Sequence, residues 1–343
     1  MAREQAASII DNSKFLTDED DQRQEAPTKE RAASRRRIAV ICIVGLIAAA
    51  AIFAYNYFWL LHPIGNGPAG PSVPREPFGL VWSKRPVVLV GMGDSMTEGF
   101  GSTSQHSYFE RLAKNSDDEF PDMRRICLSA VLPNLDANNI AVSGSTSIEH
   151  IELLLPKLKQ HPNEIFGVVV LTTGGNDIIH NYGRTPPREG AMYGATIEQA
   201  HPWIKNFEER LNAMLDQIEA RFPGGCRIFV ANIYDPTDGV GDIENAGLPA
   251  WPNGLKLVEA YNNVIAKCAA NNDSVELVDI HTEFLGHGIH SLQFWREYYD
   301  ADDPHYWYFD NLEDPNDRGY DAIRRLFLIK MAEVLPSVLS DEE

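Results

Sequence analysis

Residues 86–101 read PVVLVGMGDSMTEGFG, a short apolar run followed directly by a glycine-rich polar turn. A strand over Pro86–Met92 that turns at Gly93-Asp94-Ser95 into a helix places the Ser95 hydroxyl at the carboxyl end of a sheet, where ligands bind in open α/β folds. Backbone N–H groups at a helix start also favour negative charge. An acyl-transfer nucleophile needs this exposure and these nearby donors. Gly-Asp-Ser is also ordinary turn chemistry, so the rest of the chain decides its meaning.

Short apolar runs alternate with amphipathic segments beyond residue 80. The apolar runs are rich in β-branched residues and lack polar alternation, as strands buried on both faces do. This alternation predicts a parallel sheet covered by helices on both faces, interrupted by two long loops at 180–195 and 235–253. We expect strands at 87–90, 140–142, 166–171, 228–231 and 275–280, and helices at 108–114, 147–159, 198–221, 255–269 and 320–335, the last stopped by Pro336.

Three residues suited to acyl-transfer chemistry follow the first three predicted strands. Ser95 follows the first strand, Gly144 the second and Asn176 the third. Because the carboxyl ends of parallel strands share one edge of the sheet, we expect all three residues at one crevice. A glycine leaves its backbone N–H open to close approach, and an asparagine side chain supplies a neutral donor. The pattern indicates a serine nucleophile surrounded by oxyanion donors.

These blocks resemble the SGNH (GDSL-type) hydrolase family over roughly residues 85–338. The first block of the family corresponds to Gly93-Asp94-Ser95, the second to Gly144 and the third to Gly174-Gly175-Asn176-Asp177. The resemblance implies a flavodoxin-like, three-layer α/β/α fold with a five-stranded parallel sheet. It also implies Ser95 as the nucleophile, and the Ser95 N–H, the Gly144 N–H and the Asn176 side chain as oxyanion donors. No metal or organic cofactor is expected.

The last block departs from the family's usual pattern. The family usually closes with Asp-x-x-His just before a Pro-Asn and the last helix. Here Asn311 and Asp314 stand at those two positions, ahead of Pro315-Asn316. A carboxylate is a weak base at neutral pH. We therefore expect either a base from elsewhere in the chain, or catalysis that is altered or absent.

The candidates for that base are histidines at or after the end of the fifth predicted strand. The nearest Asp-x-x-His is Asp302-Asp303-Pro304-His305. With this spacing Asp302 would orient the imidazole of His305, and His305 would take the Ser95 proton. We expect His305 as the base and keep His287 and His290 in reserve. A surface-loop histidine among the aromatic residues 306–309 is the alternative for His305, and a site without a histidine base stays open.

Charge and composition limit the classes of partner. The chain has 343 residues and a formal net charge of −19, and residues 1–37 sum to zero, so the excess lies beyond them. A strongly acidic region argues against nucleic acid and anionic lipid as electrostatic partners.

The carboxylates of residues 235–244 could ligate calcium through oxygen, but they lack an EF-hand pattern and are interpreted as a solvated loop. Three of the four cysteines lie outside the apolar segment at 38–61, which allows at most one disulfide there.

The sequence of residues 1–77 predicts membrane attachment. Residues 38–61 are uncharged and mostly apolar, which is long enough to cross a bilayer as a helix. Arg35-Arg36-Arg37 precede them, which places residues 1–37 in the cytoplasm as a disordered tail and the remainder outside it. A cleaved signal peptide or a buried soluble helix are the competing interpretations. Residues 62–77 are expected to form a Pro/Gly linker, and residues 78–343 the catalytic domain.

Together these features predict a membrane-anchored, extracytoplasmic serine esterase that acts on acyl or acetyl esters. Its substrate would be a small-molecule, lipid or carbohydrate ester, and its membrane contact would be the N-terminal helix. The alternatives are an acyltransferase on the same fold, for which the anchor argues, and a non-catalytic envelope binding or scaffold protein, for which Asp314 at the histidine position argues.

Overall fold

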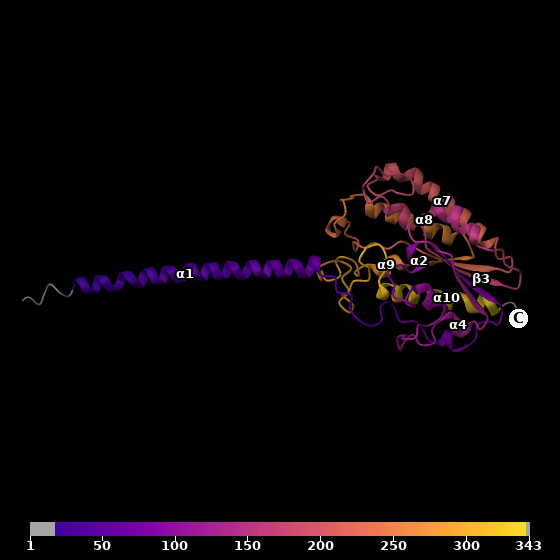
Figure 1. Cartoon of the computed structure of the whole chain (residues 1–343), viewed down its shortest axis with the longest axis horizontal. Coiled ribbons are helices and arrows are strands. Elements are labelled where there is room, and N and C mark those ends of the chain that lie inside the picture. The colour runs from indigo at the N-terminus through magenta and orange to yellow at the C-terminus, as the bar shows by residue number, and fades with distance from the viewer. Residues whose placement is uncertain (1–17, 341–343) are drawn as a thin grey trace, which may run out of the picture. The chain divides into compact units, whose positions relative to one another are not determined.

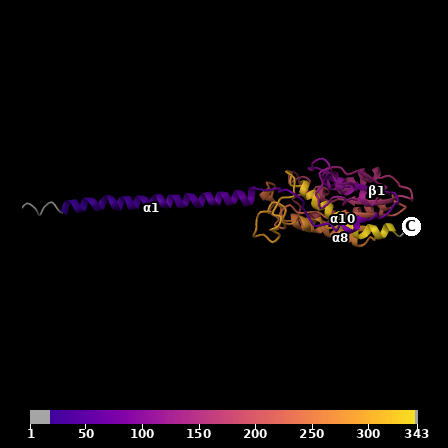
Figure 2. The same cartoon turned by 90° about the horizontal axis from the view of Figure 1, so that it is seen from below.

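The computed structural model describes residues 18–340 and divides after Leu60 into two compact units. The first consists of helix α1 (Asp18–Tyr55), a single uninterrupted helix in both Figure 1 and Figure 2, and the short π-helical turn η1 (Asn56–Leu60). Its part from Lys29 to Leu60 is long and apolar enough to cross a membrane. The first 17 residues of the predicted tail lie outside the described residues. Residues 18–37 continue α1 instead of being disordered, because the segment is rich in helix-forming Glu, Gln, Ala and Arg.

The second unit is built on one five-stranded sheet in the order β2-β1-β3-β4-β5, with every pair parallel. This order and the flanking helices confirm the predicted flavodoxin-like α/β/α architecture. The strands are β1 (Val87–Met92), β2 (Leu135–Asn139), β3 (Phe166–Leu171), β4 (Cys226–Ala231) and β5 (Val275–Val278).

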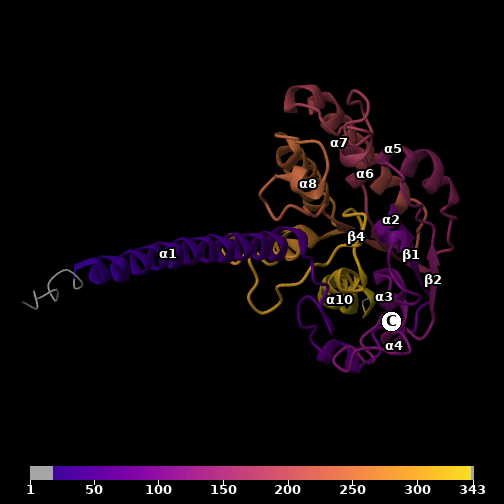
Figure 3. The same ribbon diagram turned by 60° about the vertical axis from the view of Figure 1, so that its left-hand side comes forward.

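Helices cover both faces of the sheet, as Figure 3 shows. Alternate residues of each central strand enter opposite cores: Leu89 packs in the cluster that contains α3 and α10, and Val90 in the cluster that contains α7 and α8. This is why the strands read as continuous apolar runs. The layers consist of α3 (Tyr108–Ala113), α4 (Leu128–Val131) and α10 (Asp317–Ser340) on one side, and α7 (Ile197–Glu219) and α8 (Gly254–Ala270) on the other.

Three predicted boundaries are wrong. The second strand is Leu135–Asn139, not 140–142, because β2 is an exposed edge strand whose residues are mostly polar. The predicted helix at 147–159 is split into α5 (Ser147–Glu149), the π-turn η3 (His150–Leu154) and the 3₁₀ turn η4 (Leu155–Lys157), with Pro156 inside the last. Helix α10 continues past Pro336 to Ser340, because Leu335 and Leu339 remain buried on its inner face.

Short elements complete the unit. Helices α2 (Ser95–Glu98), α6 (Gly175–Ile179) and α9 (Ile280–Phe284) begin within four residues of the carboxyl ends of β1, β3 and β5. They therefore bring their first residues to one edge of the sheet. The remaining 3₁₀ turns are η2 (Glu76–Gly79) and η5 (Ile243–Ala246).

The predicted linker at 62–77 lies on the surface of this unit. Arg318 donates to the backbone carbonyls of Ile64 at 3.0 Å and Pro68 at 3.1 Å, and the Ala69 N–H donates to Asp321 at 3.0 Å. A Cβ on Gly70, whose φ is +81°, would lie 2.6 Å from Ala322 Cα. Since α10 and these residues are in such close contact, the segment is a packed strap and not a free spacer.

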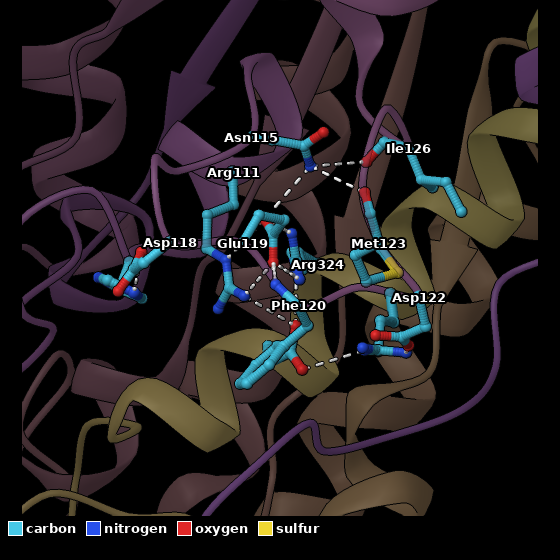
Figure 4. A network of polar contacts seen from close by, with 12 residues as sticks. Arg111, Asn115, Asp118, Glu119, Phe120, Asp122, Met123, Ile126 and Arg324 are labelled. Atoms are coloured by element: carbon cyan, nitrogen blue, oxygen red, sulfur yellow. Dashed lines mark hydrogen bonds and ion pairs between the residues drawn. The ribbon is translucent and has the colours of Figure 1, made fainter.

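A cluster of buried charges ties α10 to α3 (Figure 4). The Glu119 carboxylate accepts from Arg111 Nη2 at 2.8 Å and from Arg324 Nη1 and Nη2 at 2.5 and 2.7 Å. Asp321 accepts from Arg324 Nε at 2.6 Å. Burial opposes the charge on Glu119, but the two arginines outweigh it and lower the pKa of Glu119 to about 2. The Glu119 carboxylate is therefore ionised throughout the physiological range.

Candidate active site

The first candidate residue, Ser95, is placed by the turn that follows β1. Gly93 has a φ of +149°, and a Cβ there would lie 2.2 Å from Thr172 Oγ1, so the close approach of the two strands requires glycine. Asp94 then caps α2 by accepting the Met96 N–H at 3.3 Å. Ser95 is the first residue of the helix, so its N–H has no partner within α2. Both its hydroxyl and its N–H are thus presented at the sheet edge.

Asn176 reaches the same place from the start of α6. Its side-chain Nδ2 donates to the Ser145 carbonyl at 3.0 Å, and both Ser95 and Asn176 line one cavity. Gly144 precedes Ser145 in an exposed loop with a φ of +77°, and in the part of the chain that the structure describes its N–H has no hydrogen-bond partner. The structure therefore brings Ser95 and Asn176 together, with Gly144 one residue from the Asn176 partner.

A buried histidine, His150, is hydrogen-bonded to the loop that carries Gly144. His150 is fully buried, with Nε2 2.9 Å from Ser145 Oγ and Nδ1 2.9 Å from Thr173 Oγ1. Burial lowers the pKa of His150 to about 3, so the ring is neutral and bonds two hydroxyl groups. Asp177 of the third block accepts from the Ser147 N–H and hydroxyl at 2.8 and 2.6 Å, which anchors the start of α5.

Two buried carboxyl groups flank Ser95. Asp94 accepts the Thr172 hydroxyl at 2.7 Å, and burial, opposed by this bond and assisted by the charge of Asp314, raises the pKa of Asp94 to about 6. The second group is Asp314, whose carboxylate accepts a hydrogen bond from Asn311 Nδ2. Asp314 is 3% exposed, and burial raises the pKa of its carboxyl above the ordinary aspartate value.

The turn at 309–315 fixes the Asp314 carboxylate. Asn311 Nδ2 donates to Asp314 Oδ2 at 2.6 Å, and Asn311 Oδ1 accepts the Asp314 N–H at 3.1 Å. Leu312, between them, has a φ of +67°, the left-handed region that branched side chains rarely adopt. The hydroxyl groups of Tyr182 and Tyr234 hold the neighbouring Glu313 through its carboxylate and its carbonyl. The turn is therefore held from both sides over Ser95.

The expected base, His305, lies elsewhere. Its Nδ1 is 2.5 Å from Asp303 Oδ1, while the predicted partner Asp302 is exposed and accepts no bond from the ring. The ring packs on the strap, since a Cβ on Gly65 would lie 2.5 Å from it. His305 is not among the residues that line the cavity beside Ser95.

The two reserve histidines are also engaged away from Ser95. The His287 ring stacks on Trp307 with centroids 3.5 Å apart, and its Nδ1 is 3.1 Å from the His305 carbonyl. His290 Nε2 is 2.8 Å from Asp242 Oδ1. Neither ring lines the cavity beside Ser95.

The cavity beside Ser95, which we call the Ser95 cavity, encloses about 1100 Å³ of empty space, part of it open to solvent. Both long loops predicted from the sequence contribute to its wall, the first through Tyr182 and Tyr193 and the second through Trp251. Ser95, Asn176 and Glu313 are among its few polar groups. The other walls are largely aliphatic: Ile178, Ile179, Ile243, Leu248, Leu255 and Val258.

The acidic side chains of the second long loop organise the loop itself. Asp235 accepts the Thr237 hydroxyl at 2.7 Å, and Asp238 accepts the N–H groups of Gly286 and Gly288 at 2.9 and 2.8 Å. Among the described residues no group of three or more His, Cys, Asp and Glu side chains is arranged to hold a metal ion.

Sequence reasoning missed one feature of the last block, the burial of the Asp314 carboxyl beside Asn311. The available signal was the spacing, since Asn311 and Asp314 keep the three-residue interval and the Pro-Asn that the family uses for its last block. The residue types argued against it. Trp251 of the cavity wall was also missed, because it lies in a loop without periodicity.

Comparison with known proteins gives the following matches. Residues 92–322 match the model of the GDSL-like Lipase/Acylhydrolase family. An uncharacterised protein of Bacillus subtilis, YpmR, is 25% identical over 156 residues, which span 45% of this chain and 54% of that protein. An extracellular lipase from Streptomyces rimosus is similar with a TM-score of 0.46 and 19% identity, covering 72% of this chain and 99% of that one. An acetyl xylan esterase from Geobacillus stearothermophilus has a TM-score of 0.44 and 16% identity, covering 72% and 94%.

Proposed function

The chain belongs to the GDSL-like lipase/acylhydrolase family, and from that membership we propose that it is a serine esterase acting on esters with an apolar acyl chain. The observation that carries the proposal is the position of Ser95, at a helix start, in a cavity whose walls are largely aliphatic and aromatic. A nucleophile at the polar end of an apolar cavity suits an ester carbonyl with its hydrocarbon branch buried.

In the proposed reaction Ser95 Oγ attacks the ester carbonyl, and negative charge develops on the carbonyl oxygen. The N–H groups of Ser95 and Gly144 and the Asn176 side chain would receive that charge. Support comes from the Ser95 and Gly144 N–H groups, which have no partner inside the described part of the chain, and from Asn176, whose bond to Ser145 holds its amide at the cavity. Each such donor contributes about 10²–10³ in kcat in a preorganised site.

The size of the Ser95 cavity favours an acyl chain longer than acetyl. Each buried CH₂ contributes about 0.8 kcal/mol, or roughly fourfold in binding. The aliphatic residues of α8 and of the second loop, Leu255, Val258 and Leu248, would bury several such groups. We further infer that residues 29–60 anchor the protein in a membrane with the esterase on the extracytoplasmic side, because Arg35, Arg36 and Arg37 precede the apolar stretch.

The test uses the full-length chain in detergent micelles. We expect hydrolysis of p-nitrophenyl esters, with kcat/KM rising from acetyl to octanoyl, and labelling of Ser95 by a fluorophosphonate. Ser95→Ala should abolish labelling and reduce hydrolysis by several orders of magnitude. Ser104→Ala, an exposed serine in the loop after α2, is the matched control and should keep full activity. Hydrolysis that is unaffected by Ser95→Ala would refute the proposal, and ester exchange with an added alcohol in place of hydrolysis would make the protein an acyltransferase.

A further inference from the structure

We propose that the loop at 291–299 is a second membrane contact, and that its Phe294 and Trp295 insert into the interfacial layer of the bilayer that residues 29–60 cross. This contact rests on the membrane anchor proposed above and goes beyond it, because the second unit then meets the lipid surface in a defined orientation. The partner is the headgroup region of a lipid bilayer, where aromatic side chains are favoured.

The loop at 291–299 displays large aromatic side chains to solvent. Phe294 is 64% exposed, Trp295 46% and Tyr298 41%. The rings of Phe294 and Trp295 contact each other edge to face, with centroids 5.0 Å apart. Single exposed apolar residues are ordinary on a protein surface, but three exposed aromatic side chains within five residues of one loop are typical of an interaction site.

Hydrogen bonds and close packing hold this loop in one conformation. The Gln293 N–H donates to the His290 carbonyl, and the Arg296 N–H donates to the Gln293 carbonyl, both at 2.8 Å. Arg296 Nε donates to Gln293 Oε1 at 2.9 Å. Gly286, whose φ is +94°, faces the Tyr298 carbonyl so closely that a Cβ would not fit. Because the aromatic pair is carried by an ordered turn, its insertion costs little conformational entropy.

Chain connectivity brings one part of the second unit to the membrane. In the proposed anchor the apolar stretch ends at Leu60, whereas His62 belongs to the second unit, where its ring stacks on Tyr306 with centroids 5.0 Å apart. The Tyr306 N–H also donates to the Pro63 carbonyl at 2.8 Å. Consecutive Cα atoms are about 3.8 Å apart, so His62 lies within about 8 Å of the end of the apolar stretch. The surface around His62 must therefore lie next to the bilayer.

The loop at 291–299 starts beside that surface. Tyr306, which holds His62, is followed by Trp307, whose N–H donates to the His287 carbonyl at 3.0 Å. The rings of His287 and Trp307 also stack, with centroids 3.5 Å apart. His287 precedes the loop by four residues, so the loop and the strap are held by the same two aromatic residues. The exposed aromatic pair therefore lies on the part of the second unit from which the chain enters the membrane.

The charges of this segment favour an aromatic contact over an electrostatic one. Residues 291–303 contain one cation, Arg296, which lies 3.7 Å from the Asp242 carboxylate. The same residues contain four carboxylates, those of Glu297, Asp300, Asp302 and Asp303. Such a segment is not attracted to anionic lipid. The contact depends instead on burial of the aromatic rings, so we expect it to form on zwitterionic phosphatidylcholine.

A spin label beside the aromatic pair tests the contact. The full-length chain with Cys42→Ala carries a nitroxide at Glu297→Cys and is reconstituted in phosphatidylcholine liposomes. Collision rates with oxygen, which partitions into lipid, and with a water-soluble nickel chelate measure how deep the label lies. We expect an oxygen-to-nickel ratio several-fold above that of a label at Leu80→Cys, a strongly exposed position before β1.

Two matched variants show whether the rings are responsible. Phe294→Ser/Trp295→Ser should lower the ratio at position 297 to the value at position 80. Leu153→Ser removes a comparably exposed apolar side chain from η3, and this control should leave the ratio at position 297 unchanged. Circular dichroism and a thermal melt check that each variant is folded.

The outcomes separate this contact from the anchor and from the esterase, since no measurement depends on ester hydrolysis. A label on the native Cys42 reports on the anchor. If Cys42 lies in lipid but the ratio at position 297 equals that at position 80, or persists in Phe294→Ser/Trp295→Ser, the aromatic contact is wrong and the anchor stands. An aqueous ratio at Cys42 would refute both. Low collision rates with both reagents at position 297, with spin–spin broadening, would assign the patch to a second copy of the chain and overturn the membrane contact.

Discussion

Around Ser95, burial sets the charge of individual side chains. Asp94 has its pKa raised to about 6, Asp314 has its pKa raised, and His150 has its pKa lowered to about 3. Each shift favours the neutral form, because desolvation penalises charge. The neutral His150 ring bonds the hydroxyls of Ser145 and Thr173 and thereby holds the loop that carries Gly144. A residue outside the Ser95 cavity thus helps to position a proposed oxyanion donor.

This role predicts a pH-dependent stability difference. His150→Leu should destabilise the protein at pH 7 by about 1–3 kcal/mol, because two buried hydroxyls lose a partner. The folded pKa of His150 is depressed, so its contribution is present above about 6.5 and is lost as pH falls toward about 3. The difference between wild type and variant should therefore shrink between pH 6.5 and 4, by up to about 1.4 kcal/mol per pH unit.

Urea unfolding at pH 7 and pH 5 measures this difference. His201→Leu is the matched control, since His201 is exposed on α7, and it should change stability by less than about 0.5 kcal/mol at both pH values. An equal destabilisation of His150→Leu at the two pH values would contradict a neutral, buried ring.

Among the elements, helix α10 connects the turn at 309–315 to a buried cluster of charges. It begins directly after the turn that carries Asp314, and its Arg324 joins Glu119 and Arg111 in the buried cluster of Figure 4. Its Asp321 also pairs with Arg324. A buried ion pair is weak evidence for stability as such, but removal of one partner leaves an uncompensated buried charge. The cluster therefore fixes the direction in which α10 leaves the site.

Loss of the central carboxylate should be costly. Glu119→Gln is expected to destabilise the protein by about 3–5 kcal/mol, because Arg111 and Arg324 would lose the carboxylate they share and would both depend on Asp321. The pKa of Glu119 is lowered to about 2, so the stability that its charge contributes is fully present above about pH 4.5 and is lost as pH falls through about 2. The destabilisation caused by Glu119→Gln should therefore be constant from about pH 5 to 9.

Chemical unfolding checks this prediction. Asp118→Asn is the neighbouring control, since Asp118 is exposed and forms an ion pair with His106 at 3.2 Å, and it should cost less than about 1 kcal/mol. A Glu119→Gln protein as stable as the control would show that the arginines find other partners.

At the scale of the whole chain, an apolar N-terminal helix and an enzyme unit are joined by a packed strap. Residues 62–69 of the strap contact His305 and Arg318 of this unit. The three cysteines of the enzyme unit are buried, and Cys42 lies in the apolar helix. Exposed engineered thiols can therefore report on sidedness without interference from the enzyme unit.

The proposed orientation predicts opposite labelling of two variants that each carry one added cysteine. Ser104→Cys, in the enzyme unit, should react with a membrane-impermeant maleimide in intact cells or spheroplasts, whereas Ser34→Cys, before the arginine triplet, should react only after permeabilisation. The reverse pattern would place the enzyme unit in the cytoplasm. Release of a shortened, soluble chain would indicate a cleaved signal sequence.

Local pattern alone was enough for the architecture and for Ser95, Gly144 and Asn176 as site candidates. Strands buried on both faces must be continuously apolar, and residues that follow parallel strands must share one edge. The proton acceptor was not accessible in this way. Nothing local distinguishes Asp302-Asp303-Pro304-His305 from a catalytic pair, and a buried, more basic Asp314 exists only once α10, the 309–315 turn and the Ser95 cavity are assembled around it. Desolvation and contact between distant segments are properties of the packed molecule, so only the tertiary structure buries Asp314 and pairs His305 with Asp303.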